Sequence, residues 1–291
     1  AYSSLALTFG WSICWSIAAV STTYVTNGCT ADGECEKEGS PFVLFLFLVS
    51  YYWTVQVINN VTHVTVAGTV GTWWFAPQEA ASCCSNAVRD SWKRAMTYSF
   101  GSICFGSLIV AIIQAIKEMV HQMRNQDDGM LLCLAECLIG CIEGLVEYFN
   151  KWAFVFVGLY GYTFMEAGKN VMTLFRSKGW TTIITDMLVD AVLTMTSVGV
   201  GVITGVCGIL VAQSLGLDLG DANASIGGPF LVGFVFGFVL AGVLFSVVSS
   251  AVNTVIVCYA EAPAEFQQNH PELSDRMREA WRQAWPNDFR Y

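Results

Sequence analysis

Charged residues are scarce in this sequence. Only 13% of the 291 residues are charged and 54% are hydrophobic, and this charged share is about half of that in soluble domains. A soluble protein of this length would need more charge to cover its surface, so the composition argues against one. The net charge of −9 also argues against a nucleic-acid partner, because proteins that bind nucleic acid present basic surfaces.

Motifs for catalysis and nucleotide binding are missing as well. The sequence has no Gly-x-x-x-x-Gly-Lys phosphate loop and no glycine fingerprint behind a strand. Its three histidines, His63, His121 and His270, lie far apart. Three cysteines recur every fourth residue at Cys133, Cys137 and Cys141, but no histidine joins them at a ligand spacing, and zinc sites need four ligands. We therefore expect a protein that is not an enzyme and holds no metal or cofactor.

Long apolar stretches fill most of the chain. A helix that crosses a membrane needs ~20 mostly apolar residues, and only helices or closed barrels satisfy the backbone in lipid. The stretches lack the short alternating pattern of barrel strands, so we predict helices. They cover residues 1–25, 42–75, 96–116, 152–175 and 181–258, and the last is long enough for two spans around a polar loop at 215–229.

The expected fold is therefore all-α, a polytopic membrane bundle of about six transmembrane helices over residues 1–258. A cytosolic tail with a short helix follows over 259–291. The chain begins inside an apolar stretch without Met or a basic start. It does not resemble a signal peptide, so we expect the start to be a truncation.

Residues 129–150 form a different kind of segment, which we predict to be an amphipathic, cysteine-containing helix. Glu136, Glu143 and Glu147 share one narrow face of this helix. Three carboxylates facing lipid would be costly. The helix is therefore expected to lie in the membrane interface or to pack against other helices, and a re-entrant arrangement is a third option.

The charges of the loops predict the orientation, because basic residues collect on the cytosolic side. Loop 27–40 holds four acidic residues against one Lys, and loop 215–229 holds two acidic residues and no basic one. We expect both loops outside. Segments 76–94 and 169–179 each hold three basic residues, and we expect both in the cytosol. The plasma membrane is the expected location.

Two modifications are predicted on the outer side. Cys29 and Cys35 share the acidic loop, and a disulfide between them fits an oxidising compartment, although two free thiols remain an alternative. Asn223 begins an Asn-Ala-Ser sequon in the second outer loop, where it is a candidate for glycosylation.

Polar residues cluster in the second apolar stretch. Trp53, Gln56 and Asn60 fall on one helical face, and His63 continues it. Polar groups at membrane depth usually face a bundle interior or a water-filled path, and an aromatic ring beside neutral amides suits a cation of diffuse charge. These four residues are the candidate substrate site. The alternative is a polar contact between helices with an aromatic belt at the membrane interface.

Paired glycines mark close helix packing in the last two spans. Gly201 and Gly205 form one pair four residues apart, and Gly233 and Gly237 form another. Such pairs let helix backbones approach closely in lipid.

Several runs resemble the choline transporter-like family, in particular its fungal and protist branch. The first run, residues 63–75, reads His-Val-Thr-Val-Ala-Gly-Thr-Val-Gly-Thr-Trp-Trp-Phe. The others are residues 99–108, residues 150–161 beginning Asn-Lys-Trp-Ala, Val252-Asn253-Thr254, and Asn269-His270-Pro271-Glu272-Leu273. The runs follow the family's order along nearly the whole chain.

The resemblance implies a ten-span protein with both termini in the cytosol, of which this chain is the C-terminal half. It implies transport of choline or a related amine such as ethanolamine, with proton exchange as the coupling. In animal members an Asn stands at the position of Gln56 and a Gln at that of His63, which leaves the substrate open. Glu166 is a candidate charge partner for a cation or proton. Besides lipids, the expected partner is a small organic cation, and the alternatives are a membrane scaffold without transport or a channel.

Overall fold

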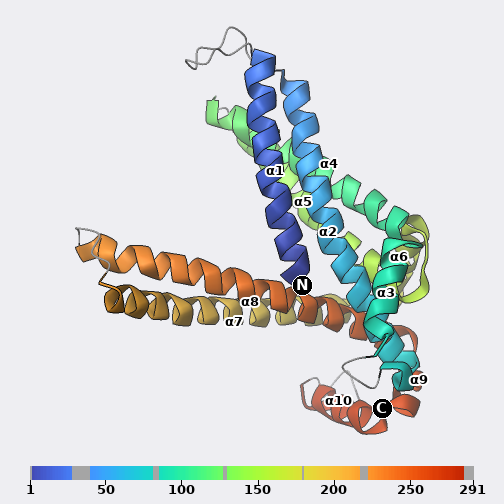
Figure 1. Ribbon diagram of the computed structural model, residues 1–291. Coiled ribbons are helices and arrows are strands. Elements are labelled where there is room, and N and C mark those ends of the chain that lie inside the picture. The colour runs from blue at the N-terminus through green and yellow to red at the C-terminus, as the bar shows by residue number, and fades with distance from the viewer. Residues whose placement is uncertain are drawn as a thin grey trace.

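The computed structural model describes residues 2–27, 40–80, 85–126, 130–178, 180–216 and 222–284. Within these ranges the secondary structure is helical (Figure 1). The elements are α1 (Tyr2–Asn27), α2 (Pro41–Phe75), the 3-10 helix η1 (Pro77–Ala80), α3 (Ala87–Met96), α4 (Phe100–Gln126), α5 (Met130–Tyr160), α6 (Phe164–Lys178), α7 (Trp180–Ser214), α8 (Ala222–Glu261), α9 (Pro263–Asn269) and α10 (Pro271–Ala284). The predicted helical membrane bundle is confirmed.

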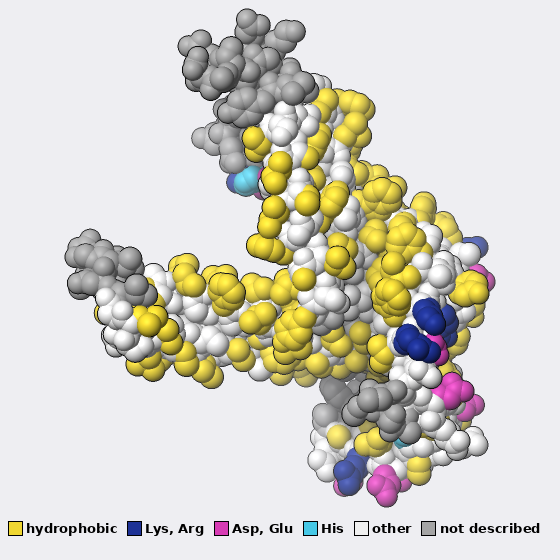
Figure 2. Space-filling view, in the orientation of Figure 1, with side chains coloured by type: hydrophobic (Ala, Val, Ile, Leu, Met, Phe, Trp, Pro, Cys, Tyr) yellow, Lys and Arg dark blue, Asp and Glu magenta, His cyan; other side chains and the backbone are white. Residues whose placement is uncertain are grey.

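Two long hairpins give the molecule its shape. Helices α1 and α2 form one antiparallel arm, and α7 and α8 form a second arm that leaves the first at a steep angle (Figure 1). Helices α4 and α5 pack against α2, and α6 packs mainly against α5. Five helices of the described chain are long and apolar enough to cross a membrane, namely α1, α2, α4, α7 and α8. The visible faces of both arms are mostly hydrophobic (Figure 2), as contact with lipid requires.

The second half of α5 is the centre of the core. Six consecutive residues from Trp152 to Val157 are buried, and a helix that is apolar and buried on all sides must be surrounded by other elements. Glycine brings α5 close to α2, because a Cβ at Gly158 would lie 2.7 Å from the Ala67 Cβ and 2.8 Å from the Val64 carbonyl oxygen. The core of the bundle is thus built around this α2–α5 contact.

The predicted span over 152–175 is not one helix. Helix α5 ends at Tyr160, and Gly161 follows with a φ of 71° while its N–H bonds the Val157 carbonyl at 3.0 Å. A left-handed glycine after the last turn is a common helix stop. The predicted amphipathic segment and the first part of this predicted span instead form a single 31-residue helix, and the rest of the span belongs to α6.

The acidic face of α5 packs against α4, one of the locations left open by the sequence. Helix α4 runs to Gln126, ten residues past the predicted end of its apolar stretch, and this extension carries Lys117, His121 and Arg124. Lys117 pairs with Glu143 at 2.6 Å. Arg124 and His121 both contact Glu136, at 2.7 and 2.9 Å. These pairs explain how α5 carries carboxylates without exposing them to lipid.

The polar loop predicted over 215–229 is shorter in the structure. Helix α8 already begins at Ala222 and contains Pro229. Membrane helices tolerate an internal proline because neighbouring helices re-satisfy the freed backbone groups. Polar composition and Pro229 suggested a longer loop than the chain forms.

The paired glycines lie where α7 and α8 approach closely, as predicted. A Cβ at Gly201 would lie 3.0 Å from the Phe234 ring, and one at Gly205 would lie 2.7 Å from the Phe230 ring. A Cβ at Gly233 would overlap the Thr204 carbonyl oxygen, and one at Gly237 would overlap the Thr204 side chain. The two backbones approach closely because these positions lack side chains.

The helices after α8 dock on the end of α2. The rings of Trp74 and Phe266 stack at 4.2 Å, and the Asn269 amide donates to the Trp74 carbonyl at 2.9 Å. His270 stacks on Trp73 at 4.1 Å. The described tail thus contains two helices, α9 and α10, with aromatic contacts that tie it to the bundle.

Candidate functional site

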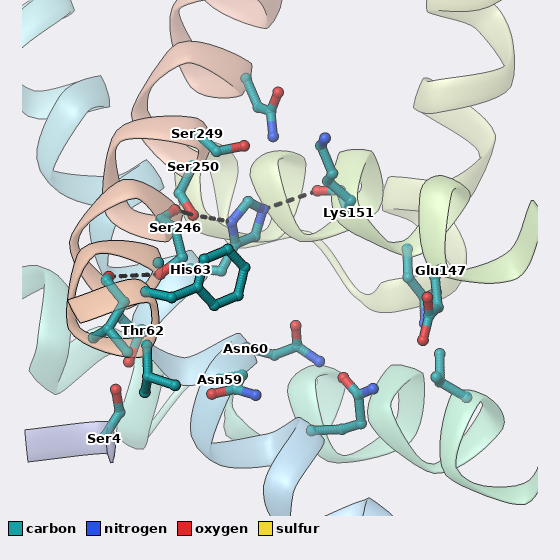
Figure 3. A pocket seen from close by; sticks show the side chains of 18 residues that line it. Ser4, Asn59, Asn60, Thr62, His63, Glu147, Lys151, Ser246, Ser249 and Ser250 are labelled. Carbon is teal, nitrogen blue, oxygen red and sulfur yellow. Dashed lines mark hydrogen bonds between the residues drawn. The ribbon is translucent and has the colours of Figure 1, made fainter. Parts of the chain in front are cut away.

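A polar cavity of about 580 Å³ lies where the two arms meet. Its walls come mainly from α2, α5 and α8, with single residues from α1 and α4 (Figure 3). The polar and charged lining residues are Ser4, Gln56, Asn59, Asn60, Thr62, His63, Glu147, Asn150, Lys151, Ser246, Ser249, Ser250 and Asn253. Polar groups gathered this way inside a membrane bundle usually mark a substrate or ion path.

All four predicted substrate-site residues lie on α2, and three of them line the cavity. Gln56, Asn60 and His63 recur at i, i+4 and i+7, and all three line the cavity. The Asn60 amide donates to the Ser107 hydroxyl at 2.9 Å, which fixes its position against α4. Three of the four residues on the predicted face of this helix therefore border the cavity.

His63 joins three helices. Its Nε2 lies 2.9 Å from the Lys151 carbonyl oxygen of α5, and its Nδ1 lies 2.6 Å from the Ser250 hydroxyl of α8 (Figure 3). A carbonyl oxygen can only accept, so Nε2 carries a proton. His63 therefore holds the α8 arm against the α2–α5 core at the edge of the cavity.

One negative charge at the cavity is not balanced by a positive charge. The Lys151 ammonium, which lines the cavity, pairs with Asp190 of α7 at 2.9 Å, and the Ser249 hydroxyl donates to the same carboxylate at 2.8 Å. Glu147 is the carboxylate on the described lining, and it accepts a hydrogen bond from the neutral Gln114 amide at 2.9 Å. Glu136 and Glu143 pair with basic residues of α4, whereas the Glu147 carboxylate bonds a neutral amide of α4 and also lines the cavity.

A polar stripe on α8 forms the wall opposite Glu147. Ser246, Ser249, Ser250 and Asn253 recur at i, i+3, i+4 and i+7, and Figure 3 places the three serines across the cavity from Glu147. The serine hydroxyls are engaged within the protein. Asn253 differs, because it is only 1% exposed and neither amide atom has a hydrogen-bond partner among the described residues.

Two predicted residues lie away from the lining. The Trp53 indole N–H donates to the Cys104 carbonyl at 2.9 Å, which ties α2 to α4, and the side chain is 38% exposed. Glu166 lies exposed in the first turn of α6. Neither residue is among those that border the cavity.

Other predictions concern thiols and modifications. Cys29 and Cys35 lie outside the described residues, as does the side chain of Asn223, whose backbone is in the first turn of α8. Cys133, Cys137 and Cys141 are exposed free thiols on α5. In the part of the chain that the structure describes, no three His, Cys, Asp or Glu side chains gather as a metal ion would require.

Sequence reasoning missed Glu147, Lys151 and the α8 stripe as site residues. The stripe had a detectable signal, since Ser and Asn recur with helical spacing inside an otherwise apolar span. The Lys151–Asp190 pair had none, because its two residues are 39 positions apart and meet only through the packing of α5 and α7.

Comparison with known proteins identifies the family. A family described as plasma-membrane choline transporter matches residues 1–264. This chain belongs to the choline transporter-like family. The resemblance inferred from the residue runs is therefore confirmed.

Curated relatives in this family are fungal proteins named PNS1. The one from Mycosarcoma maydis is 34% identical over 207 residues, which cover 68% of this chain and 38% of the relative. The one from Gibberella zeae is 38% identical over 175 residues, covering 57% and 32%, and that from Candida albicans is 36% identical over 173 residues, covering 57% and 33%. The chain spans about a third of the length of these relatives.

Proposed function

We propose that this choline transporter-like chain forms part of a membrane carrier for a small organic cation such as choline or ethanolamine. The observation that carries the proposal is the cavity between the arms. Its volume of about 580 Å³ falls in the ordinary range for small-molecule sites. Its walls combine neutral polar groups with an excess carboxylate, and a cation taken out of water needs such compensation.

The α2 residues have proposed roles in this scheme. Gln56 and Asn60 shape the polar path, and His63 closes its α8 side. We also propose, from what the family resemblance implies, that transport of the cation is coupled to proton exchange. Membership of a transporter family favours transport over catalysis.

Reconstitution tests the proposed function directly. The full-length protein in liposomes is expected to show saturable uptake of radiolabelled choline and acceleration by choline on the opposite side. Linear flux without counterflow would indicate a channel. No flux above protein-free liposomes would favour a scaffold and would contradict the proposal.

Trp53 is proposed to offer a π face to the cation on its way to the cavity. Leucine keeps the apolar bulk but lacks the ring quadrupole, whereas phenylalanine keeps a weaker one. We expect Trp53→Leu to raise the half-saturation concentration for choline by up to about tenfold and Trp53→Phe to raise it less.

Both Trp53 variants lose the hydrogen bond to the Cys104 carbonyl, so they are matched for that contact. Equal losses in the two variants would show that the hydrogen bond between α2 and α4 is what matters. Concentration dependence of choline uptake at equal protein levels is the measurement.

The orientation and location are also proposed. We place loops 27–40 and 215–229 outside the plasma membrane and the tail after α8 in the cytosol. Basic side chains gather around α3, on the same side of the molecule as the tail helices (Figures 1 and 2). The Cys29–Cys35 disulfide and glycosylation at Asn223 belong to this proposed outer side.

Labelling of single cysteines in sealed cells tests the orientation. A cysteine in loop 27–40 is expected to react with an impermeant maleimide, and one at Gln267 of α9 is expected to react only after the cells are opened. Reaction at Gln267 in sealed cells would reverse the assignment.

A further inference from the structure

Asn253 presents hydrogen-bonding groups that the described protein does not use. It lines the cavity, is only 1% exposed, and neither its Nδ2 nor its Oδ1 has a partner among the described residues. Buried amides in folded proteins are nearly always hydrogen-bonded, and an unmet one costs free energy. An amide in the wall of a cavity with both polar atoms unpaired is therefore a candidate to bind a ligand there.

The polar neighbours of Asn253 on α8 are already engaged. The Ser249 hydroxyl donates to Asp190 at 2.8 Å. The Ser250 hydroxyl lies 2.6 Å from the His63 ring, and the Thr254 hydroxyl donates to the Ser250 carbonyl at 2.8 Å. Asn253 is thus the side chain of the stripe whose hydrogen-bond donor and acceptor are both available to a ligand.

The amide group of Asn253 indicates which kind of ligand would bind. An amide offers one donating and one accepting group, and a single hydroxyl group can form hydrogen bonds with both at once. Glu147 lies on the α5 wall of the same cavity and offers a negative charge. A ligand that satisfies both walls carries a cation at one end and a hydroxyl at the other, which is the structure of an amino alcohol.

We propose that Asn253 binds the hydroxyl group of the transported cation and thereby selects amino alcohols over ammonium ions that lack a hydroxyl. The proposal rests on the proposed function of the cavity. A site built to bond a hydroxyl rejects the analogue without it, because the analogue leaves the buried amide unpaired.

Competition between two ligands of nearly equal size tests the selection. Choline and ethyltrimethylammonium differ only in the hydroxyl group. We expect the parent to bind choline at least about tenfold more tightly, measured as inhibition of radiolabelled choline binding to the purified full-length protein. In Asn253→Leu this preference is expected to fall to near unity, mainly because choline binds less tightly.

Stability separates a ligand-binding role from a structural one. Since Asn253 has no described partner to lose, Asn253→Leu without ligand is expected to unfold at a temperature no lower than the parent. A lower unfolding temperature would mean that the amide supports the fold, and would overturn the proposal. Asn253→Ala, which avoids added bulk, is expected to lose the preference as well.

Asn59→Leu is the matched control, because Asn59 also lines the cavity but is exposed. It should change the affinity for the two ligands by the same factor and so keep the parental ratio between them. The hydroxyl contact would be refuted, but not the proposed function of the cavity, if Asn253→Leu keeps the preference. The same conclusion would follow if the parent binds both ligands equally. A parent that binds neither ligand would instead refute the proposed function of the cavity.

Discussion

Replacing Glu147 with glutamine is expected to remove most choline uptake. The substitution keeps the size of the side chain but deletes the negative charge in excess around the cavity, and the Lys151–Asp190 pair then leaves no net charge to attract a cation. Glu147 is exposed at the edge of the cavity, which weakens its attraction for a cation. We therefore expect the half-saturation concentration for choline to rise by at least about tenfold, or ~1.4 kcal/mol of binding free energy.

Glu143→Gln is the control for Glu147→Gln. Glu143 lies one turn away on the same face of α5 but pairs with Lys117 at 2.6 Å. Its substitution should lower thermal stability and leave the half-saturation concentration for choline near the parental value. Uptake by Glu147→Gln with parental kinetics would show that the cation is neutralised elsewhere, and Glu166 would then be the next carboxylate to test.

Gly233→Ala is expected to cause the largest loss of stability. The new methyl group would overlap the Thr204 carbonyl oxygen and lie 3.1 Å from the Gly205 Cα, so it meets backbone of α7 that cannot rotate away. Overpacking of this kind costs ~1–3 kcal/mol or more. The measurement is the unfolding temperature and the yield of folded protein in detergent.

Gly242→Ala provides the comparison within the same helix. A Cβ at Gly242 has no neighbour within 4 Å, and alanine favours a helix by up to ~1 kcal/mol over glycine. This variant should be as stable as the parent or slightly more so. Equal losses at the two positions would mean that the backbones of α7 and α8 do not need to approach at Gly233.

The sequence alone predicted the class of fold and three residues that line the cavity. Apolar stretches defined α1, α2, α7 and α8, because span length and composition depend on the chain itself. Helical spacing placed Gln56, Asn60 and His63 on one face, and all three border the cavity. Paired glycines correctly predicted where α7 and α8 touch.

Features that depend on pairing between distant segments were less predictable. The amphipathic segment had no definite location until its carboxylates met Lys117 and Arg124 of α4. Periodicity could not show that α5 continues through residue 151, nor that one left-handed glycine ends it at Tyr160. Within the α8 stripe nothing in the sequence set Asn253 apart from the serines, because what distinguishes it is that its amide has no partner among the described residues.

The most direct test of the account is whether choline occupies the cavity itself. We suggest Asn59→Cys in a background without other reactive cysteines, since Asn59 lines the cavity and is exposed, with Tyr98→Cys, at a position 91% exposed and outside the lining, as the reference. The account predicts that choline slows alkylation at position 59 near its half-saturation concentration for transport and leaves position 98 unchanged. Unchanged alkylation at position 59 under saturating choline would contradict it.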